Sequence, residues 1–463
     1  MNVGVFTIAS KNYLAYARTL MASVKQHHPE YRRYLCLADK VDGYFAPLEE
    51  NFEVIQADSL GIDTFQDMTI RYDIMEFNTA VKPFMIEWLF KNTDLDAVIY
   101  LDPDIQVFSR FVLLESELMN GASVVLTPHI TRPEEDGLNP NDYHMLQAGV
   151  FNLGFIALRR CDEAIRFVQW WGRRLKTQCA ADVSKNLFTD QRWCDLAPCF
   201  LDHLKVLKNP GFNVAYWNLA QRKITCNEAG NWLADNNPLV FFHFSGVNAD
   251  QRTLVSKHQN RFNWKDIPSC QSLFENYLNS LVKSGWRSCK HWPYAYSCVG
   301  GSFRIPSVVR QLFREKEPQP KSFESSDAPL SLYLTNLCNE PAQNIPQHPD
   351  VTITSLMFFV YRSRPDLQAV FNLSSADGQL GFAHWFEISG IREYDLPNEV
   401  ALQKLIRAAE EEGAQKKTVV FAVQAFNVSA DLSRRIGNCF PRPLREKGKT
   451  VLRRLEKSLY RRI

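Results

Sequence analysis

The chain has 463 residues, a length typical of two or three domains. With 45% hydrophobic and 12% aromatic residues it can bury sizeable cores, which excludes an intrinsically disordered protein. Lys and Arg number 53 against 51 Asp and Glu, so the net charge is only +2 and nothing in this balance favours binding to nucleic acid.

The chain begins directly with a strand-like run, 3–9, and not with the basic and apolar regions of a signal peptide. No apolar run approaches the roughly 18 residues that a membrane-spanning helix needs. We therefore expect a bacterial, cytoplasmic protein. The eleven cysteines are scattered without a Cys-x-x-Cys pair, a pattern that favours reduced thiols over disulfides or zinc ligands.

The first 265 residues alternate short apolar runs with amphipathic segments. Strands are predicted at 3–9, 34–38, 97–101, 123–127, 150–158 and 238–244, and helices at 13–28, 80–91 and 163–178. Such alternation favours an α/β fold with a largely parallel sheet that is covered by helices on both faces. We therefore assign residues 1–265 to one domain of this class.

The pattern after this domain is helical. Residues 266–320 are expected to form a helical extension that contains a clear helix at 272–284. A stretch at 314–326, rich in Pro, Ser and charged residues, is typical of a linker. Residues 321–440 are expected to form a mainly helical accessory domain. Its best helices are predicted near 351–361 and 398–413.

The C-terminal segment 441–463 differs again in composition. From residue 442 onward it carries nine Lys or Arg against two Glu, and its apolar residues fall at helical spacing. A helix with one apolar and one basic face is typical of an interfacial helix on an anionic membrane surface. The equally favoured alternative is a solvated helix that packs on its own domain.

An Asp-x-Asp pair is the most informative feature of the chain. Asp102 and Asp104 directly follow the predicted strand 97–101, so both carboxylates can reach one cation. Mg²⁺ and Mn²⁺ prefer oxygen ligands and keep open positions that the diphosphate of a nucleotide can fill. Open α/β sheets also bind ligands at the carboxyl ends of their strands. The alternative is an ordinary turn after a strand, since Asp and Pro are common turn residues.

Further polar signatures occur in a fixed order around this pair. They are Thr7 with Asn12-Tyr13, Lys82-Pro83, Gly149-Val-Phe-Asn152-Leu-Gly154, Thr189-Asp190-Gln191 and His243-Phe-Ser-Gly246. In order and content they resemble glycosyltransferase family 8, whose members are retaining enzymes of the GT-A fold, a Rossmann-like nucleotide-sugar-binding fold. The resemblance covers roughly residues 1–250.

The resemblance implies a role for each of these residues. Asp102, Asp104 and His243 would hold Mn²⁺ or Mg²⁺, since a borderline ion such as Mn²⁺ accepts both carboxylate and imidazole ligands. The donor, a nucleotide sugar, would be bound by Thr7, Asn12, Tyr13, Lys82, Asp102, Gly246 and Lys257. The residues that act on the sugar would be Asp190, Gln191 and Asn152.

Each role has a structural alternative. A single histidine on an apolar strand is more often a buried core residue than a ligand, although the Asp-x-Asp pair elsewhere in the chain favours the ligand for His243. Asn12 could simply begin a helix, Lys82 could be an exposed helix residue, and Asp190 could be a helix N-cap.

Three features depart from the family pattern. Ser10 and Lys11 stand where many members have the acidic residue that reads uracil, so uridine is expected but not secured. The Lys-Pro-Trp that follows His-x-x-Gly in the family is absent, and Lys257 or Arg252 would neutralise the diphosphate instead. The region beyond residue 265 is not part of the minimal fold, and we expect its aromatic residues to form a core.

The sequence therefore predicts a metal-dependent hexosyltransferase. It would move a hexose from a UDP-sugar to a glycan or lipid-linked glycan with retention, in the synthesis of a bacterial surface polysaccharide such as O-antigen, as a peripheral protein at the inner face of the plasma membrane. The alternatives are an inverting GT-A transferase with Asp190 as general base, and a non-catalytic glycan-binding scaffold. A nucleotidyltransferase is disfavoured because the turn at 9–12 contains no glycine.

Overall fold

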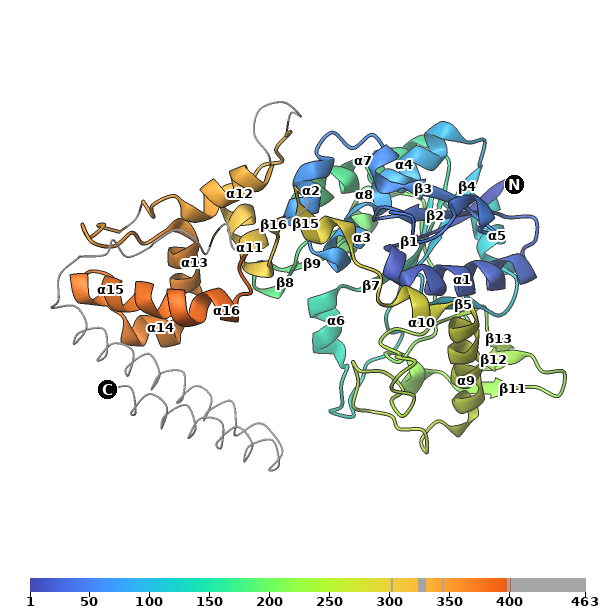
Figure 1. Cartoon of the computed structure of the whole chain (residues 1–463). Coiled ribbons are helices and arrows are strands. Elements are labelled where there is room, and N and C mark those ends of the chain that lie inside the picture. Colours follow the sequence, from blue (N-terminus) through green and yellow to red (C-terminus); the bar gives the residue numbers. More distant parts are fainter. Residues whose placement is uncertain (301–302, 324–329, 344, 398–399, 401–463) are drawn as a thin grey trace. The chain divides into compact units, whose positions relative to one another are not determined.

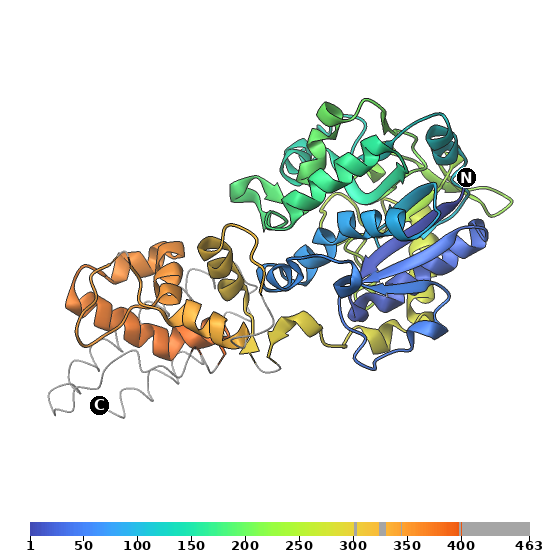
Figure 2. The same ribbon diagram turned by 90° about the horizontal axis from the view of Figure 1, so that it is seen from above.

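The structure is a computed structural model that describes residues 1–300, 303–323, 330–343, 345–397 and 400 (Figures 1 and 2). Contacts divide the chain into two units, which are described separately. Unit 1 contains Met1–Ser297 and Glu317–Phe323, and unit 2 contains Cys298–Lys316 and the described residues from 330 onward.

Unit 1 is built on a mixed seven-stranded sheet of order β10-β6-β7-β4-β1-β2-β3. Neighbouring strands are parallel except around β7, which runs antiparallel to both β4 and β6. The strands are β1 (Val3–Ala9), β2 (Arg32–Leu37), β3 (Glu53–Gln56), β4 (Ala97–Leu101), β6 (Val124–Pro128), β7 (Phe151–Arg159) and β10 (Leu204–Val206). The predicted α/β class is confirmed.

Helices cover both faces of this sheet (Figure 1). On β4, Ile99 and Leu101 belong to one core and Val98 and Tyr100 to the other, because successive side chains of a strand point to opposite faces. The helix α1 (Leu14–His27) packs in the first core, and α4 (Lys82–Asn92) and α7 (Asp162–Leu175) pack in the second. Burial on both faces explains why β4 is apolar throughout.

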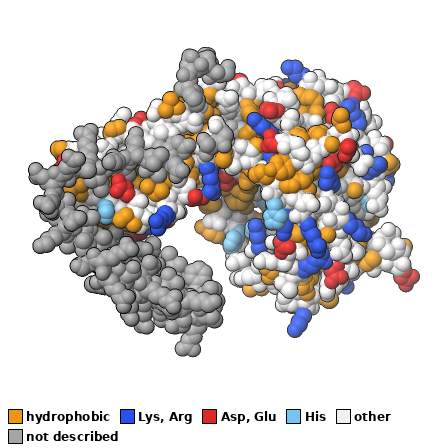
Figure 3. Space-filling model, in the orientation of Figure 1, with side chains coloured by type: hydrophobic (Ala, Val, Ile, Leu, Met, Phe, Trp, Pro, Cys, Tyr) orange, Lys and Arg blue, Asp and Glu red, His pale blue; other side chains and the backbone are white. Residues whose placement is uncertain are grey.

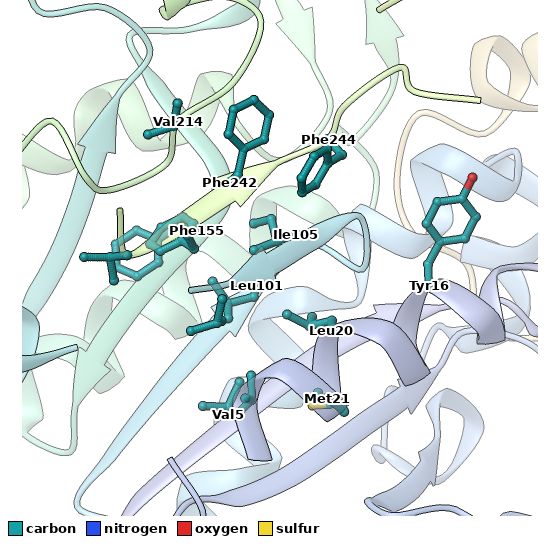
Figure 4. Packing of buried hydrophobic residues seen from close by; sticks show 14 of the residues in the cluster. Val5, Tyr16, Leu20, Met21, Leu101, Ile105, Phe155, Val214, Phe242 and Phe244 are labelled. Carbon is teal, nitrogen blue, oxygen red and sulfur yellow. The ribbon is translucent and has the colours of Figure 1, made fainter. Parts of the chain in front are cut away.

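The first core extends beyond the sheet to a two-stranded ribbon. Here β5 (Ile105–Val107) pairs antiparallel with β14 (Phe241–His243). Figure 4 shows residues from both parts gathered in this core, among them Val5, Leu20, Met21, Leu101, Ile105, Phe155, Phe242 and Phe244. The ribbon is thereby fixed against the carboxyl end of β4.

Two predicted elements differ from the structure. The predicted helix 80–91 corresponds mainly to α4, while Ala80 is the last residue of a preceding helix, α3 (Ile74–Ala80). The two helices meet at Val81 because Pro83 is suited to the first turn of a helix and not to its middle. The predicted strand 238–244 is longer than the strand that the structure shows there, β14. This strand pairs in the two-stranded ribbon and not in the seven-stranded sheet.

The region after residue 265 contributes to the core of unit 1. The helices α9 (Pro268–Lys283) and α10 (Trp286–Cys289) pack on α1, and the ring of Tyr277 stacks on Phe244 with centroids 3.8 Å apart. As expected, the aromatic residues of this region that lie in α9 and α10 are core residues. The segment 266–320, predicted as one extension, is divided between the two units.

Unit 2 is mainly helical in its described part. Its helices are α11 (Ser307–Lys316), α12 (Leu330–Asn339), α13 (Ser355–Ser363), α14 (Pro365–Val370), α15 (Ala376–Trp385) and α16 (Ile391–Glu393). The predicted linker begins too early, since residues 314–316 form the last turn of α11. The predicted helix near 351–361 overlaps α13, whereas 401–413 and the predicted C-terminal helix 441–463 lie outside the described residues.

None of the helices in the described residues is long and apolar enough to cross a membrane. On the face of unit 1 seen in Figure 3, acidic and basic side chains are interspersed, in keeping with the near-neutral charge of the chain.

Candidate active site

Two carboxylates and an imidazole converge where β4 ends and the ribbon begins. Asp102 and Asp104 lie between β4 and β5, and the ribbon register places His243 opposite Ile105. His243 Nε2 is 2.9 Å from Asp104 Oδ1 and 3.6 Å from Asp102 Oδ2. One ligand atom from each of the three residues lies within 4.8 Å of the others. The structure thus brings together the three predicted metal ligands.

This group fits a divalent cation. His243 is only 3% exposed, and its Nε2 faces the two carboxylates. Burial by itself lowers the pKa of His243, but the adjacent Asp104 and Asp102 outweigh this effect and the pKa is raised. The Tyr100 hydroxyl donates to Asp102 Oδ1 at 2.5 Å, the kind of outer contact that orients a ligand. Two carboxylate oxygens and one imidazole nitrogen form a ligand set that divalent metal ions can accept.

Gly154 makes room for the histidine. A Cβ atom at this position of β7 would lie 2.5 Å from His243 Cε1 and 2.7 Å from its Nδ1. Real Cβ contacts are not that short, so the imidazole can pack against β7 only over a glycine. The backbone also connects the two strands here, because Asp102 N–H donates to Gly154 O at 2.8 Å. The predicted Phe-Asn-x-Gly signature therefore has a steric reason.

Lys82 and Asp190 form a buried ion pair beside the candidate metal-ligand group of Asp102, Asp104 and His243. Lys82 Nζ donates to Asp190 Oδ2 at 2.5 Å and to Leu153 O at 2.7 Å, and it lies 4.1 Å from the centre of the Tyr100 ring. The lysine side chain is 1% exposed and the aspartate side chain 3%. The alternative of an exposed Lys82 is therefore wrong. The Asp190 carboxylate pairs with Lys82 and does not cap a helix, since Gln191 occupies the N-cap of the following turn.

Asn152 belongs to a network of buried amides. Its Oδ1 accepts from Asn213 Nδ2 at 3.0 Å and from Gly154 N–H at 3.2 Å. Gln191 Oε1 accepts from Leu153 N–H at 3.0 Å and lies 3.5 Å from Asn152 Nδ2. The network places the predicted residues Asn152 and Gln191 side by side.

Two further residues of this network, His129 and Asn213, are not predicted from the sequence. His129 Nε2 lies 3.2 Å from Asn152 Nδ2, and Asn213 connects Asn152 to Thr127 Oγ1 at 2.8 Å. Burial lowers the pKa of His129 to about 4, so it is a neutral imidazole that can accept the amide hydrogen. Neither residue lies in a short motif, and only the positive φ of 51° at Asn213, a geometry that asparagine tolerates, distinguishes its position.

A cavity of about 280 Å³ opens at the carboxyl end of β1. Its walls include Ser10, Asn12, Tyr13, Asn78, Asp102 and Asp104. Tyr13 is 44% exposed and its ring stacks on Tyr16 with centroids 4.5 Å apart. A flat exposed ring beside amide and hydroxyl groups is suited to packing and hydrogen bonding with a nucleoside. Asn12 and Tyr13 thus line the same cavity as Asp102 and Asp104.

Two other residues near the start of the chain do not line this cavity. Thr7 is fully buried within β1, and its Oγ1 has no hydrogen-bond partner among the described residues. The Lys11 side chain is also fully buried and pairs with Asp39 at 3.2 Å and Asp42 at 2.8 Å. Of the two residues that stand where the family often has an acid, only Ser10 faces the cavity.

A second cavity of about 400 Å³ shares Asn12, Tyr13 and Asp104 with the first. The predicted residues Gly246 and Lys257 line it. Arg252 is not one of its lining residues and donates to Asn279 Oδ1 at 3.2 Å instead. Of the two predicted partners for a diphosphate, Lys257 is therefore the better placed.

A second group of acidic and histidine residues, His28, Glu30 and Glu115, does not fit a cation. His28 Nε2 accepts from Phe111 N–H at 3.0 Å, so the proton of the neutral ring is on Nδ1, the nitrogen that faces Glu30. A metal would have to displace this proton. The carboxylates already have partners, which are Arg110 for Glu30 and Tyr31 for Glu115. We interpret the group as a structural cluster.

The chain matches no protein-family model. Two uncharacterized proteins of Bacillus subtilis (strain 168) are similar in sequence. YfnF is 22% identical over 288 residues, which are 60% of this chain and 92% of YfnF. YfnD is 24% identical over 286 residues, which are 60% of this chain and 88% of YfnD.

Solved structures with some similarity include two glycosyltransferases. Galactosyltransferase LgtC in complex with donor and acceptor sugar analogues aligns with a TM-score of 0.38 and 16% identity, over 62% of this chain and 99% of LgtC. Glycosyltransferase GlyE of Streptococcus pneumoniae TIGR4 aligns with a TM-score of 0.35 and 15% identity, over 67% of this chain and 72% of GlyE.

Three features of its topology define the architecture of unit 1. The first cavity lies at the carboxyl ends of parallel strands. The strand β7 lies antiparallel between β4 and β6. An Asp-x-Asp pair directly follows β4. These features make unit 1 an α/β domain with a mixed seven-stranded sheet, the fold class predicted from the sequence.

Proposed function

We propose that unit 1 is a metal-dependent glycosyltransferase domain that moves a hexose from a UDP-sugar to a glycan acceptor. One observation carries the proposal: the group Asp102, Asp104 and His243 adjoins two cavities and lies beside the Lys82–Asp190 ion pair. Ligands for a cation, space for a nucleotide and polar groups for a sugar are thus parts of one site.

The donor would extend across both cavities. The nucleoside would occupy the cavity at Ser10, Asn12 and Tyr13, and the diphosphate would lie at Asp104 and Gly246, which line the second cavity. A divalent ion held by Asp102, Asp104 and His243 would supply Lewis-acid stabilisation of the charge on the leaving diphosphate. Tyr100 and Gly154 keep the ligand side chains oriented for this role.

The sugar would lie near Asp190, Gln191 and Asn152. Transfer creates positive charge at the anomeric carbon, which a buried carboxylate and amide oxygens stabilise. Retention is supported by the ion pair, because Lys82 holds the carboxylate that an inverting enzyme would use as a general base. In a retaining transfer the acceptor hydroxyl attacks from the leaving-group face and passes its proton to a diphosphate oxygen.

The acceptor and the pathway are proposed from the sequence. A lipid-linked glycan of a bacterial surface polysaccharide, such as O-antigen, fits a transferase whose basic segment 442–463 would bring it to an anionic membrane. The enzyme would then act at the inner face of the plasma membrane.

The test is donor binding and hydrolysis with a panel of nucleotide sugars, with and without Mn²⁺. Asp104→Asn removes one ligand charge. Asp94→Asn is the matched control, because the Asp94 side chain is 80% exposed, pairs with Arg32 and precedes β4, whereas Asp102 and Asp104 follow that strand. We expect Mn²⁺-dependent turnover of a UDP-sugar by the wild type and the control, and its loss in Asp104→Asn. If the wild type binds sugars but neither binds nor hydrolyses any nucleotide sugar, the chain is a glycan-binding scaffold.

A further inference from the structure

The second cavity is lined by a positively charged side chain, Lys290, that belongs to none of the sequence signatures. Lys290 lines it together with Lys257, Asp104 and Gly246. Lys290 directly follows α10, in the region that is not part of the minimal fold. The region beyond residue 265 therefore supplies a side chain to the same cavity as the metal-ligand group.

The Lys290 side chain is held from two sides. Its Nζ lies 2.9 Å from Asp250 Oδ2 and 4.2 Å from the centre of the Trp286 ring. Trp286 is 6% exposed and packs in the first core, so the surface beneath the lysine is fixed. An ammonium has three N–H donors, and one bond to a carboxylate leaves the others for a ligand in the cavity. The side chain is 27% exposed and can reach such a ligand.

Lys257 reaches the cavity because the chain after His243 folds back. Lys257 N–H donates to Gly246 O at 3.2 Å, and Ser256 Oγ donates to Ser245 O at 2.9 Å. Gly246 has a φ of +75°, and a Cβ there would lie 2.4 Å from Ser256 Oγ. This close turn requires glycine and places Lys257 beside it. Within the part of the chain that the structure describes, Lys257 forms no ion pair.

We propose that Lys290, together with Lys257, binds the diphosphate of the nucleotide donor and substitutes for the lysine that this chain lacks after His-x-x-Gly. The inference rests on the proposed function and names two residues of the donor site. The Asp102 and Asp104 carboxylates would already offset the charge of a divalent ion, and further negative charge develops at the leaving oxygen of the diphosphate during transfer. Two ammonium groups in the cavity that contains Asp104 balance this charge.

Asp250 has a defined part in this arrangement. Without a donor, its carboxylate neutralises Lys290 and keeps the ammonium at the cavity wall. When the diphosphate binds, Lys290 can donate to both anions, so the lysine does not need to change its position.

The experiment compares UDP with uridine, which lacks the diphosphate, by isothermal titration calorimetry of the full chain in the presence of Mn²⁺. Lys290→Met removes the charge but keeps an unbranched side chain over Trp286, and Lys290→Arg keeps the charge. Lys283→Met, on an exposed residue at the end of α9, is the matched control. Since a charge-assisted hydrogen bond is lost, Lys290→Met should weaken UDP binding about tenfold to hundredfold and leave uridine binding unchanged.

The outcomes separate the two proposals. Loss of UDP affinity in Lys290→Met, with near wild-type affinity in Lys290→Arg and Lys283→Met, supports the inference, and a larger loss in Lys257→Met/Lys290→Met extends it. If the wild type binds UDP and Lys290→Met binds it equally well, the inference is overturned while the proposed function stands. If the wild type does not bind UDP at all, the proposed function fails and the inference fails with it.

Discussion

The Asp190 carboxylate lies 2.5 Å from the Lys82 ammonium, and both side chains are almost completely buried. The lysine opens α4, on the face of the sheet opposite α1, and the aspartate follows a residue with positive φ, Thr189. Two segments more than a hundred residues apart are thus joined by one ion pair next to the metal-ligand group. This pair connects the stability of unit 1 with the chemistry proposed for it.

Replacing Lys82 by methionine should destabilise unit 1 and abolish transfer. The Asp190 carboxylate would remain buried without its partner, which typically costs about 3–5 kcal/mol. Urea unfolding measures the loss, and Lys91→Met, on an exposed residue of the same helix, is the control. In Lys82→Met/Asp190→Asn the unpaired charge is gone, so stability should be partly regained while activity remains absent. A Lys82→Met protein as stable as the wild type would contradict this view of the pair.

Replacing only Asp190 by asparagine should affect turnover more than donor binding. The amide keeps the size of the side chain but removes the negative charge proposed to face the anomeric carbon. We expect kcat to fall about 10²- to 10³-fold, as when one preorganised electrostatic contact is lost. Initial rates at saturating donor, together with the affinity for UDP, separate the two effects. Unchanged turnover would remove Asp190 from the proposed sugar site.

Gly154→Ala should weaken metal binding without unfolding the protein. The added methyl group would lie 2.5 Å from His243 Cε1, so the imidazole must leave the two carboxylates. Calorimetric titration with Mn²⁺ measures the change. Gly172→Ala is the matched control, because its Cβ would meet its nearest neighbour, Phe84, at an ordinary 3.5 Å. Equal Mn²⁺ affinity in both variants would show that His243 is not a ligand.

Acidification should destabilise unit 1 partly through His28. Burial, helped by Arg110 and opposed by Glu115 and Glu30, lowers the pKa of this imidazole to about 4 in the folded chain. The unfolded chain, with an ordinary pKa near 6.5, then binds more protons between these two values. The contribution of the neutral His28 to stability is therefore complete above about pH 6.5 and decreases as the pH falls toward 4.

Urea unfolding between pH 4 and pH 7.5 measures this dependence. His28→Gln should be less stable than the wild type at pH 7, since the bond from Phe111 N–H is altered, but the difference between the two should shrink as the pH falls. A difference that stays constant with pH would contradict the lowered pKa.

The central strands were predictable from the sequence because they are buried on both faces. The segment 97–101 contains only apolar residues and tyrosine, and it forms β4 with the predicted bounds. The proximity of Asp102 and Asp104 was predictable for a related reason, since both residues follow that strand directly. The position of His243 needed the family resemblance, because its neighbour is the ribbon strand β5 and local sequence does not encode that pairing.

Other parts of the site depend on contacts that no local pattern encodes. Lys11 stands where the family often has an acidic residue, but its buried ammonium pairs with Asp39, whose position follows from the pairing of β1 with β2. Lys290 belongs to a region that the family resemblance does not cover. The linker was predicted too early because Glu315 and Lys316 are good helix formers that continue α11 to the residues before Pro318.

The antiparallel pairing of β7 with β4 makes the site sensitive to an insertion or deletion in either strand. Leu101 pairs with Phe155, and the Asp102 N–H donates to Gly154 O. The register between the two strands therefore determines the position of Asn152 relative to the Asp-x-Asp pair. Inserting one residue into β7 would shift the pairing register on one side of the insertion by one residue. The β7 side chains on that side would then point to the opposite face of the sheet. Length variation in this domain should therefore accumulate outside these strands, and a chain that keeps all the motif residues but gains one residue in β7 would lose the site.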